Sequence, residues 1–198
     1  MRARIAVLIS GSGTNLQALM DADQDAFDIV GVISDRADAA GLDRARAVGI
    51  PASVVAPGEY SDRSDWDAAL ADQLRGLGVS WVVCAGFMRI LGAHVLAAFP
   101  HRVINTHPAL LPAFPGAHGV RDALDYGVRV TGCTVHLVDA GVDTGPILAQ
   151  RALDVAEGED AATLHERIKG VERVLLVDIV TRLCAVGCTV NGRKVSIP

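Results

Sequence analysis

The chain has 198 residues, of which 51% are hydrophobic and 21% are charged. This composition excludes an intrinsically disordered chain and is typical of one globular domain with a substantial core, here residues 1–198. The net charge of −5 gives no electrostatic reason to expect a nucleic acid as a partner. No apolar stretch is long enough for a membrane span, and the first apolar run is too short for a signal peptide. We therefore expect a cytoplasmic protein.

The four cysteines match neither a disulfide framework nor a zinc pattern.

Apolar runs alternate with helix-like segments through the first half of the chain. Continuous apolar runs are typical of strands buried on both faces, whereas apolar residues spaced by three or four predict helices. The expected strands are residues 5–9, 29–33, 53–55, 81–85 and 103–105, and the expected helices are residues 15–22, 42–48, 65–77 and 94–99. This alternation predicts an α/β fold with a doubly wound, mostly parallel sheet.

The second half of the chain has a different pattern. Residues 130–138 and 147–155 are long enough to be strands, and no helix separates them. We expect them to extend the sheet in an antiparallel or mixed arrangement. Residues 161–185 predict a long C-terminal helix. Gly170 within it costs about 1 kcal/mol relative to alanine, which indicates either close approach by a neighbour or a tolerated glycine.

A glycine loop, residues 11–15, follows the first expected strand and opens the first helix. Consecutive main-chain amides at a helix N-terminus can bind an anion. The dinucleotide fingerprint G-x-G-x-x-G fails because Leu16 stands at its last glycine position, and no Walker lysine follows. The loop predicts a phosphate cradle without a nucleotide signature, with a purely structural tight turn as the alternative.

A second candidate site, residues 87–91, follows Gly86 at the end of the fourth expected strand. Apolar side chains at the carboxyl edge of a strand can line a slot for a flat ring, while main-chain amides bind its polar edge. From the residues alone, ordinary core is the more common role of such a run.

Asn105 and His107 give the strongest indication of chemistry. They lie two residues apart at the end of the fifth expected strand, so strand alternation points both side chains the same way. Pro108 then ends the strand, because it has no N–H for a ladder. A carboxamide can hydrogen-bond a developing oxyanion and an imidazole can move a proton. The pair therefore suits attack on a carbonyl group.

The run from Asn105 to Pro112, Asn-Thr-His-Pro-Ala-Leu-Leu-Pro, resembles the N-x-H-P-[SA]-L-L-P signature of the folate-dependent formyltransferases. The resemblance covers residues from about Arg4 to about Arg173 and implies the Rossmann-like fold of that family. It places Asp143 at the position of the family's catalytic aspartate. From the residues alone, an Asx turn at Asp143 is equally supported, because Thr144-Gly145 follows.

Within this family the chain is most similar to the members that act on 5-phosphoribosylglycinamide. The resemblance implies that 10-formyltetrahydrofolate, as co-substrate, gives its formyl group directly to the amine of that ribonucleotide, in the synthesis of the purine IMP. No covalent enzyme intermediate and no metal are expected. Asn105 and His107 would stabilise the tetrahedral oxyanion. Asp143 would favour the protonated imidazole of His107 and help relay a proton. The expected partners are small molecules, not nucleic acid or membrane, and a homodimer is left open.

The resemblance also assigns binding residues. The implied contacts of the ribonucleotide are Ser12, Gly13, Thr14, Asn15, Lys169 and Glu172. The implied contacts of the folate are Arg63, Met88, Arg89, Ile90, Leu91, Asn105, Asp139, Ala140, Gly141, Val142 and Asp143. Two of these assignments have plain alternatives: Lys169 and Glu172 share one helix face and fit a surface ion pair, and Arg63 fits a solvated charge.

Two other histidines are given lesser roles. His118 lies in the Gly/Pro-rich segment 115–119, which suits a mobile active-site flap. His136 alternates with apolar neighbours in a strand, so we expect it to be buried and hydrogen-bonded rather than catalytic. Ala113 and Val120, assigned to the same flap, stand where the family commonly has polar residues.

Three other functions share parts of this pattern. A methionyl-tRNA formyltransferase has the same N-x-H-P core but needs a further C-terminal domain and a basic surface. A formyltetrahydrofolate hydrolase passes the formyl group to water and usually carries an additional N-terminal region, whereas Ile5 here begins the first strand. A nucleotide-binding module or Rossmann oxidoreductase is disfavoured by Leu16, and by Ser34 where an acidic residue would directly end the second strand, although Asp35 is next.

Overall fold

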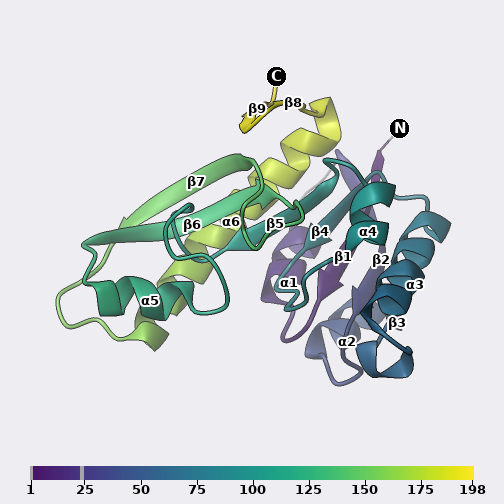
Figure 1. Cartoon of the computed structure of the whole chain (residues 1–198), viewed down its shortest axis with the longest axis horizontal. Coiled ribbons are helices and arrows are strands. Elements are labelled where there is room, and N and C mark those ends of the chain that lie inside the picture. The colour runs from purple at the N-terminus through teal and green to yellow at the C-terminus, as the bar shows by residue number, and fades with distance from the viewer. Residues whose placement is uncertain (1, 23–24) are drawn as a thin grey trace.

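The computed structural model describes residues 2–22 and 25–198. A seven-stranded sheet, in the order β3-β2-β1-β4-β5-β6-β7, carries helices on both faces (Figure 1). The strands are β1 (Ala3–Ile9), β2 (Phe27–Ser34), β3 (Ala52–Val54), β4 (Trp81–Cys84), β5 (Val103–His107), β6 (Val130–Leu137), β7 (Ile147–Asp154), β8 (Thr189–Asn191) and β9 (Lys194–Ser196). The helices are α1 (Thr14–Asp21), α2 (Ala40–Ala47), α3 (Arg63–Gly76), α4 (Ala93–Ala98), α5 (Gly119–Tyr126) and α6 (Ala161–Val186), with a 3-10 turn η1 (Pro57–Glu59).

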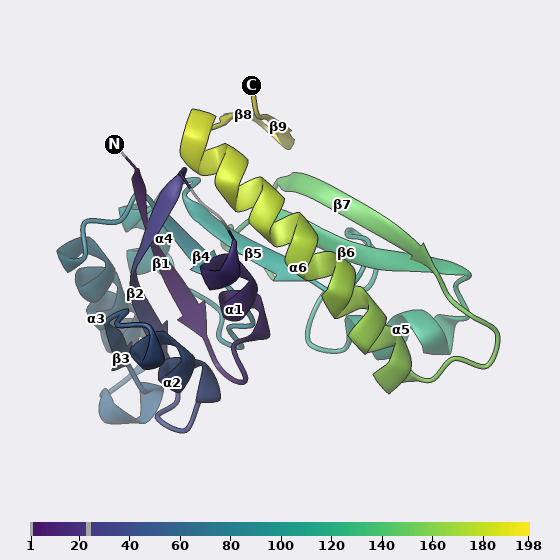
Figure 2. The ribbon, with the colours of Figure 1, turned by 180° about the vertical axis from the view of Figure 1, so that it is seen from behind.

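The first five strands are parallel, and the side chains of β1 show why the sheet is covered on both faces. Ile5, Val7 and Ile9 are buried in one core with residues of α1, α2 and α6. Ala6 and Leu8 point the other way, into a second core with α3 and α4. Figure 2 shows α6 crossing the face of the sheet that also carries α1. The predicted doubly wound α/β arrangement is confirmed.

The sheet changes direction after β5. β6 pairs antiparallel with β5, and β7 pairs antiparallel with β6. This was one of the two predicted arrangements. For β7 it follows from chain length, because a parallel return needs a crossover that residues 138–146 are too few to make. Asn105 on β5 faces His136 on β6 directly. The predicted C-terminal helix is confirmed as α6, whose N-terminus is capped by Asp160, which accepts from Thr163 N at 2.7 Å.

In the second half of the chain, one helix and one hairpin were not predicted, and the surroundings of Gly170 can now be described. Helix α5, which was not predicted, begins at the end of the expected flap segment, and Val120 and Ala123 on one side of it are buried. The β8–β9 hairpin was not predicted, since each strand has only three residues. A Cβ at Gly170 would meet no atom of the described residues within 4 Å, so no neighbouring part of the chain approaches it closely.

Parallel strands end at the same edge of a sheet, so the loops that follow β1, β4 and β5 lie together at the carboxyl edge. The glycine loop, residues 86–92 and the Asn105–His107 pair are the segments that follow or end these strands. Among the described residues, no helix is both long and apolar enough to cross a membrane.

Candidate active site

Asn105 and His136 form the floor of the candidate site. They face each other on neighbouring strands, with Asn105 Nδ2 lying 3.3 Å from His136 Nε2. His136 Nδ1 lies 2.9 Å from the carbonyl oxygen of Leu137, which can only accept, so Nδ1 carries a proton. In the neutral ring Nε2 is then an acceptor for one N–H of Asn105. The second N–H of the carboxamide stays free to donate to a substrate oxygen.

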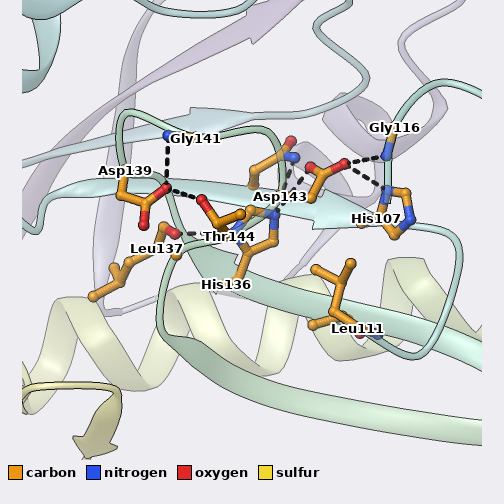
Figure 3. A network of polar contacts seen from close by, with 12 residues as sticks. His107, Leu111, Gly116, His136, Leu137, Asp139, Gly141, Asp143 and Thr144 are labelled. Carbon is orange, nitrogen blue, oxygen red and sulfur yellow. Dashed lines mark hydrogen bonds and ion pairs between the residues drawn. The ribbon is translucent and has the colours of Figure 1, made fainter. Parts of the chain in front are cut away.

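His107, the last residue of β5, is 4% exposed and has an acceptor at each ring nitrogen. Nδ1 lies 3.3 Å from the Asp143 carboxylate, and Nε2 lies 2.7 Å from the carbonyl oxygen of Phe114 (Figure 3 draws the contact with Asp143). Because a carboxylate and a carbonyl can only accept, this geometry fits a ring that donates from both nitrogens. The carbonyl oxygen of Phe114 thus accepts the hydrogen bond that His107 Nε2 could otherwise donate to a substrate.

Asp143 joins the two histidines. Its Oδ2 accepts from Gly116 N at 2.8 Å, and its Oδ1 lies 3.6 Å from His136 Nε2 (Figure 3). Burial acts to raise the pKa of Asp143, but the close contact with His136, the hydrogen bond from the Gly116 amide and the charge of His107 together lower it. The carboxyl group is therefore held ionised.

The backbone of Asp143 has φ of 54°, a conformation that costs roughly 1 kcal/mol or more for a residue with a side chain. This conformation aims the carboxylate at His107 rather than into the local turn. The turn is made instead by Asp139, whose Oδ1 accepts from Gly141 N at 3.1 Å and from Thr144 Oγ1 at 2.6 Å (Figure 3). The Asx-turn alternative for Asp143 is thus not what the geometry shows.

The three residues singled out from the sequence, Asn105, His107 and Asp143, are brought together. His136 is buried and hydrogen-bonded as expected, but its partners are Asn105 and Asp143, so it belongs to the same network. The sequence signal that would have found it is the strand register, which needs the antiparallel pairing of β5 with β6 to be known.

Residues 86–92, which contain the predicted folate segment 87–91, are held by three other parts of the chain. Met88 N donates to Ser10 Oγ at 2.8 Å, directly before the glycine loop. Arg89 forms an ion pair with Asp35 at 2.8 Å, and Arg63 donates to the carbonyl of Ile90 at 2.9 Å. The Arg63 side chain is therefore committed to this segment rather than free in solvent.

The side chains of this segment divide into two groups. Met88 and Ile90 are 72% and 50% exposed, so their apolar side chains are available to contact an apolar ligand. Leu91 and Phe87 are buried, and Phe87 stacks on Trp66 of α3 at a centroid distance of 6.4 Å. For Leu91 this leaves the main chain as the part able to meet a ligand. Of the loop assigned to the other side of the folate, Val142 is 47% exposed.

Asp67 of α3 fixes the end of the same segment, a role that the sequence gave no sign of. The side chain is 1% exposed, and its carboxylate accepts from the amides of Gly92, His94 and Val95 at 2.6, 2.8 and 3.2 Å. It thereby caps α4 from another element. A Cβ on Gly92 would lie 2.6 Å from this carboxylate, so the fit requires glycine.

The glycine loop has the form of an anion cradle. Gly13 caps α1 with φ of 72°, and no side chain caps the helix, so its first amides are left without a partner in the helix. Asn15 in the first turn is 8% exposed. Its Nδ2 donates to Glu172 Oε1 at 2.9 Å, and its buried Oδ1 has no hydrogen-bond partner among the described residues. Ser12 and Thr14 flank Gly13 at the mouth of this cradle.

Helix α6 supplies the residues predicted beside the cradle. Glu172 is 6% exposed and faces Asn15. Lys169 pairs with Glu166 at 2.7 Å, not with Glu172, so the ion pair considered for these two residues is replaced by two separate contacts. His118, directly before α5, is exposed and joins none of the contacts that the described residues make in the network, and Val120 packs into the core rather than toward a substrate.

Asp35 bears on the oxidoreductase alternative. It follows β2, where a Rossmann enzyme binds the ribose of its dinucleotide. Here its carboxylate is 4% exposed and paired with Arg89, so residues 86–92 cover that position. Among the described residues, no group of three or more His, Cys, Asp or Glu side chains is arranged to hold a metal ion.

The Rossmann-like sheet carries an amide and an imidazole at the end of β5, and the loop between β6 and β7 adds a carboxylate; this set of groups suits a group-transfer protein. A family model described as formyl transferase matches residues 3–180, so the chain belongs to the formyl transferase family.

Relatives narrow the comparison. The phosphoribosylglycinamide formyltransferase of Mycobacterium tuberculosis is 50% identical over an alignment of 202 positions, gaps included. The alignment covers 98% of this chain and 91% of that protein. The human trifunctional purine biosynthetic protein adenosine-3 is 44% identical over 174 residues, which cover 86% of this chain and 17% of that protein. The structure of glycinamide ribonucleotide transformylase 1 from Symbiobacterium toebii matches with a TM-score of 0.96 at 47% identity, covering 99% of this chain and 94% of that one.

Proposed function

We propose that this protein transfers the formyl group of 10-formyltetrahydrofolate to the amine of 5-phosphoribosylglycinamide, in purine biosynthesis. The observation that carries the proposal is the network of Asn105, His107, His136 and Asp143. It lies at the edge of the sheet that also carries the glycine cradle and residues 86–92. The names of the relatives agree with this activity.

The reaction we propose is direct attack. The substrate amine adds to the formyl carbon, and the carbonyl oxygen becomes an oxyanion that accepts from Asn105 Nδ2 and His107 Nε2. A proton leaves the new ammonium group and reaches N10 of the folate, the C–N10 bond breaks, and formylated amine and tetrahydrofolate are released. Asp143, ionised and bonded to His107 Nδ1, holds the imidazole protonated while the oxyanion exists. Each donor of this kind typically contributes about 10²–10³ in rate.

The segment 111–118 must move for this chemistry. The carbonyl of Phe114 accepts from His107 Nε2, which is the donor that the oxyanion requires. A Cβ on Gly119 would lie 2.9 Å from the same nitrogen, so the start of α5 also closes on the ring. We infer that substrate binding replaces the Phe114 carbonyl with the formyl oxygen. This moving segment contains most of the Gly/Pro-rich flap expected at residues 115–119, and it ends where α5 begins.

The binding groups are proposed as follows. The amides of Gly13, Thr14 and Asn15 hold the phosphate at the positive end of α1. Glu172, fixed by Asn15, meets the hydroxyl groups or the amine of the ribonucleotide. Residues 88–91 and 139–142 hold the two sides of the folate ring, and Arg63 lies at its outer end.

Absorbance-monitored turnover of 10-formyltetrahydrofolate, with and without 5-phosphoribosylglycinamide, tests the proposal. Consumption that depends strictly on the ribonucleotide is the expected result. Consumption without it would identify a hydrolase instead, and no consumption in either case would overturn formyl transfer. Light scattering on the same preparation measures whether the protein is a monomer or the homodimer that the sequence leaves open.

A further inference from the structure

Arg44 of α2 bridges the glycine loop and helix α1, although neither the proposed chemistry nor the sequence pattern uses it. Its Nε donates to the carbonyl of Ser12 at 2.8 Å, and its Nη1 donates to Gln17 Oε1 at 3.1 Å. One guanidinium group therefore joins the loop before α1 to the helix itself. Its planar shape fixes the relative position of both acceptors.

The contact sets the direction of a main-chain amide in the cradle. In a trans peptide the C=O and the following N–H point in opposite directions. Arg44 holds the Ser12 carbonyl on its own side, so the N–H of Gly13 points away from Arg44, toward the open start of α1. The packing here is close: a Cβ on Gly13 would lie 2.7 Å from Gly41 Cα and 3.5 Å from Arg44 Cδ.

The positive charge of Arg44 is not cancelled by these contacts. Both acceptors are neutral oxygens. Two other cations, Arg46 and Lys169, are instead neutralised by carboxylates: Arg46 pairs with Asp43 at 2.9 Å, and Lys169 pairs with Glu166 at 2.7 Å. An anion at the start of α1 would therefore be attracted by the helix dipole and, from the other side of the Ser12–Gly13 peptide, by the unneutralised charge of Arg44.

We propose that Arg44 is a positioning residue for the phosphate of the ribonucleotide substrate. It orients the Ser12–Gly13 peptide and adds a cation beside the cradle. The inference rests on the proposed function, because it assumes that the cradle binds the phosphate of 5-phosphoribosylglycinamide.

The test compares substrates with and without the phosphate, in variants with and without the guanidinium. In Arg44→Ala, KM for 5-phosphoribosylglycinamide should rise by about tenfold, the scale of one charge near a helix N-terminus together with one charge-assisted hydrogen bond. The KM for 10-formyltetrahydrofolate should not change. With glycinamide riboside, which lacks the phosphate, the variant and the parent protein should have equal kcat/KM. Arg44→Lys keeps the charge and should recover part of the loss.

Arg46→Ala is the matched control, because Arg46 lies two residues away on the same helix in a surface ion pair with Asp43. It should leave every one of these constants unchanged. An equal loss on both substrates in Arg44→Ala would overturn the proposal, since it would mean that Arg44 only maintains the fold. If Arg44→Ala does not fold, Arg44→Lys and Arg44→Gln make the same comparison, and equal KM values for the ribonucleotide in those two variants overturn it.

Calorimetric titration with ribose 5-phosphate separates this inference from the function on which it rests. Binding that weakens in Arg44→Ala, in a protein without transferase activity, would keep the phosphate role of Arg44 while removing the proposed reaction. If the parent protein is an active transferase but Arg44→Ala binds ribose 5-phosphate as tightly as the parent does, the proposed reaction stands and the phosphate role of Arg44 is overturned.

Discussion

The parallel and antiparallel parts of the sheet offer different kinds of chemical group. After β1 and β4 the chain presents mainly main-chain atoms: the amides of the glycine loop, and a segment of residues 86–92 tied by Ser10, Arg63 and Asp67. From β5 to β7 it presents side chains, because Asn105 and His136 face each other across the strands. Under the proposed function, the parallel part would mainly hold the substrates through main-chain atoms. The antiparallel part would supply the side chains that move protons, with residues 139–142 also contacting the folate.

A physical reason accounts for the difference. Parallel strands end together and turn into helices, so each end exposes amides that need a partner. An antiparallel pair instead sets two side chains directly opposite each other at close range. A loop that returns over such a pair, as residues 138–146 do, can add a third group, and here that group is Asp143.

The largest expected effect is on the antiparallel side. Asp143→Asn should lower kcat by at least about 100-fold, because the neutral amide no longer stabilises the protonated His107. Asparagine tolerates the positive φ of this position, so the fold should persist. Steady-state rates check the prediction, and Asp154→Asn, an exposed residue at the end of β7, serves as the control. Near-normal turnover would remove Asp143 from the mechanism.

His136 should show that the antiparallel pair acts as a unit. We expect His136→Ala to lower kcat by about tenfold, because Asn105 loses the acceptor that orients its carboxamide. In a double-mutant cycle with Asn105→Ala the two losses should not add, as is usual for residues in one network. The kinetics of both single variants and of the double variant supply the measurement. Additive losses would mean that the two residues act independently, and His94→Ala on the surface is the control.

Asp67 tests the parallel side, where the expected change is in binding rather than in rate. Asp67→Asn should raise the KM for 10-formyltetrahydrofolate several-fold and leave kcat close to normal. The free energy of unfolding should fall by about 2 kcal/mol, since three amides lose a charged acceptor. Kinetics and urea unfolding measure the two effects. Asp72→Asn on the exposed side of α3 is the control, and a fall in kcat with unchanged KM would contradict the division between the two regions.

The smallest effect is a pH dependence of stability from Asp143. Its pKa in the folded protein is lowered from the ordinary value of 3.8, so its ionised form contributes stability above that value. This contribution should be lost as the pH falls through the folded pKa. The difference in unfolding free energy between the parent protein and Asp143→Asn should therefore be steady well above pH 3.8, begin to fall as the pH approaches 3.8, and be lost as the pH falls through the lowered pKa of the folded protein. A difference that stays constant throughout acid unfolding would show that the network does not hold the carboxylate.

Much of the fold and part of the site could be predicted from the residues. The continuous run from Ile5 to Ile9 is apolar because β1 is covered on both faces, so its assignment needed no partner strand. Asn105 and His107 could be paired because strand alternation is a local rule. Helix α5 escaped prediction because its single buried side depends on α6 and β6 being in place, and the glycines and prolines before it indicate a loop.

By itself the sequence determined the parallel strands, the cradle at α1 and the carboxamide–imidazole pair, since each is set by neighbouring residues and by local geometry. Tertiary structure alone decided that His136 joins the pair, that Asp67 fixes residues 86–92, and that Arg44 holds the loop at Ser12. These contacts join residues far apart in the chain, and their partners are fixed by strand register and helix packing. A hydrogen bond requires its two atoms to lie within about 3 Å, and no local pattern specifies that distance.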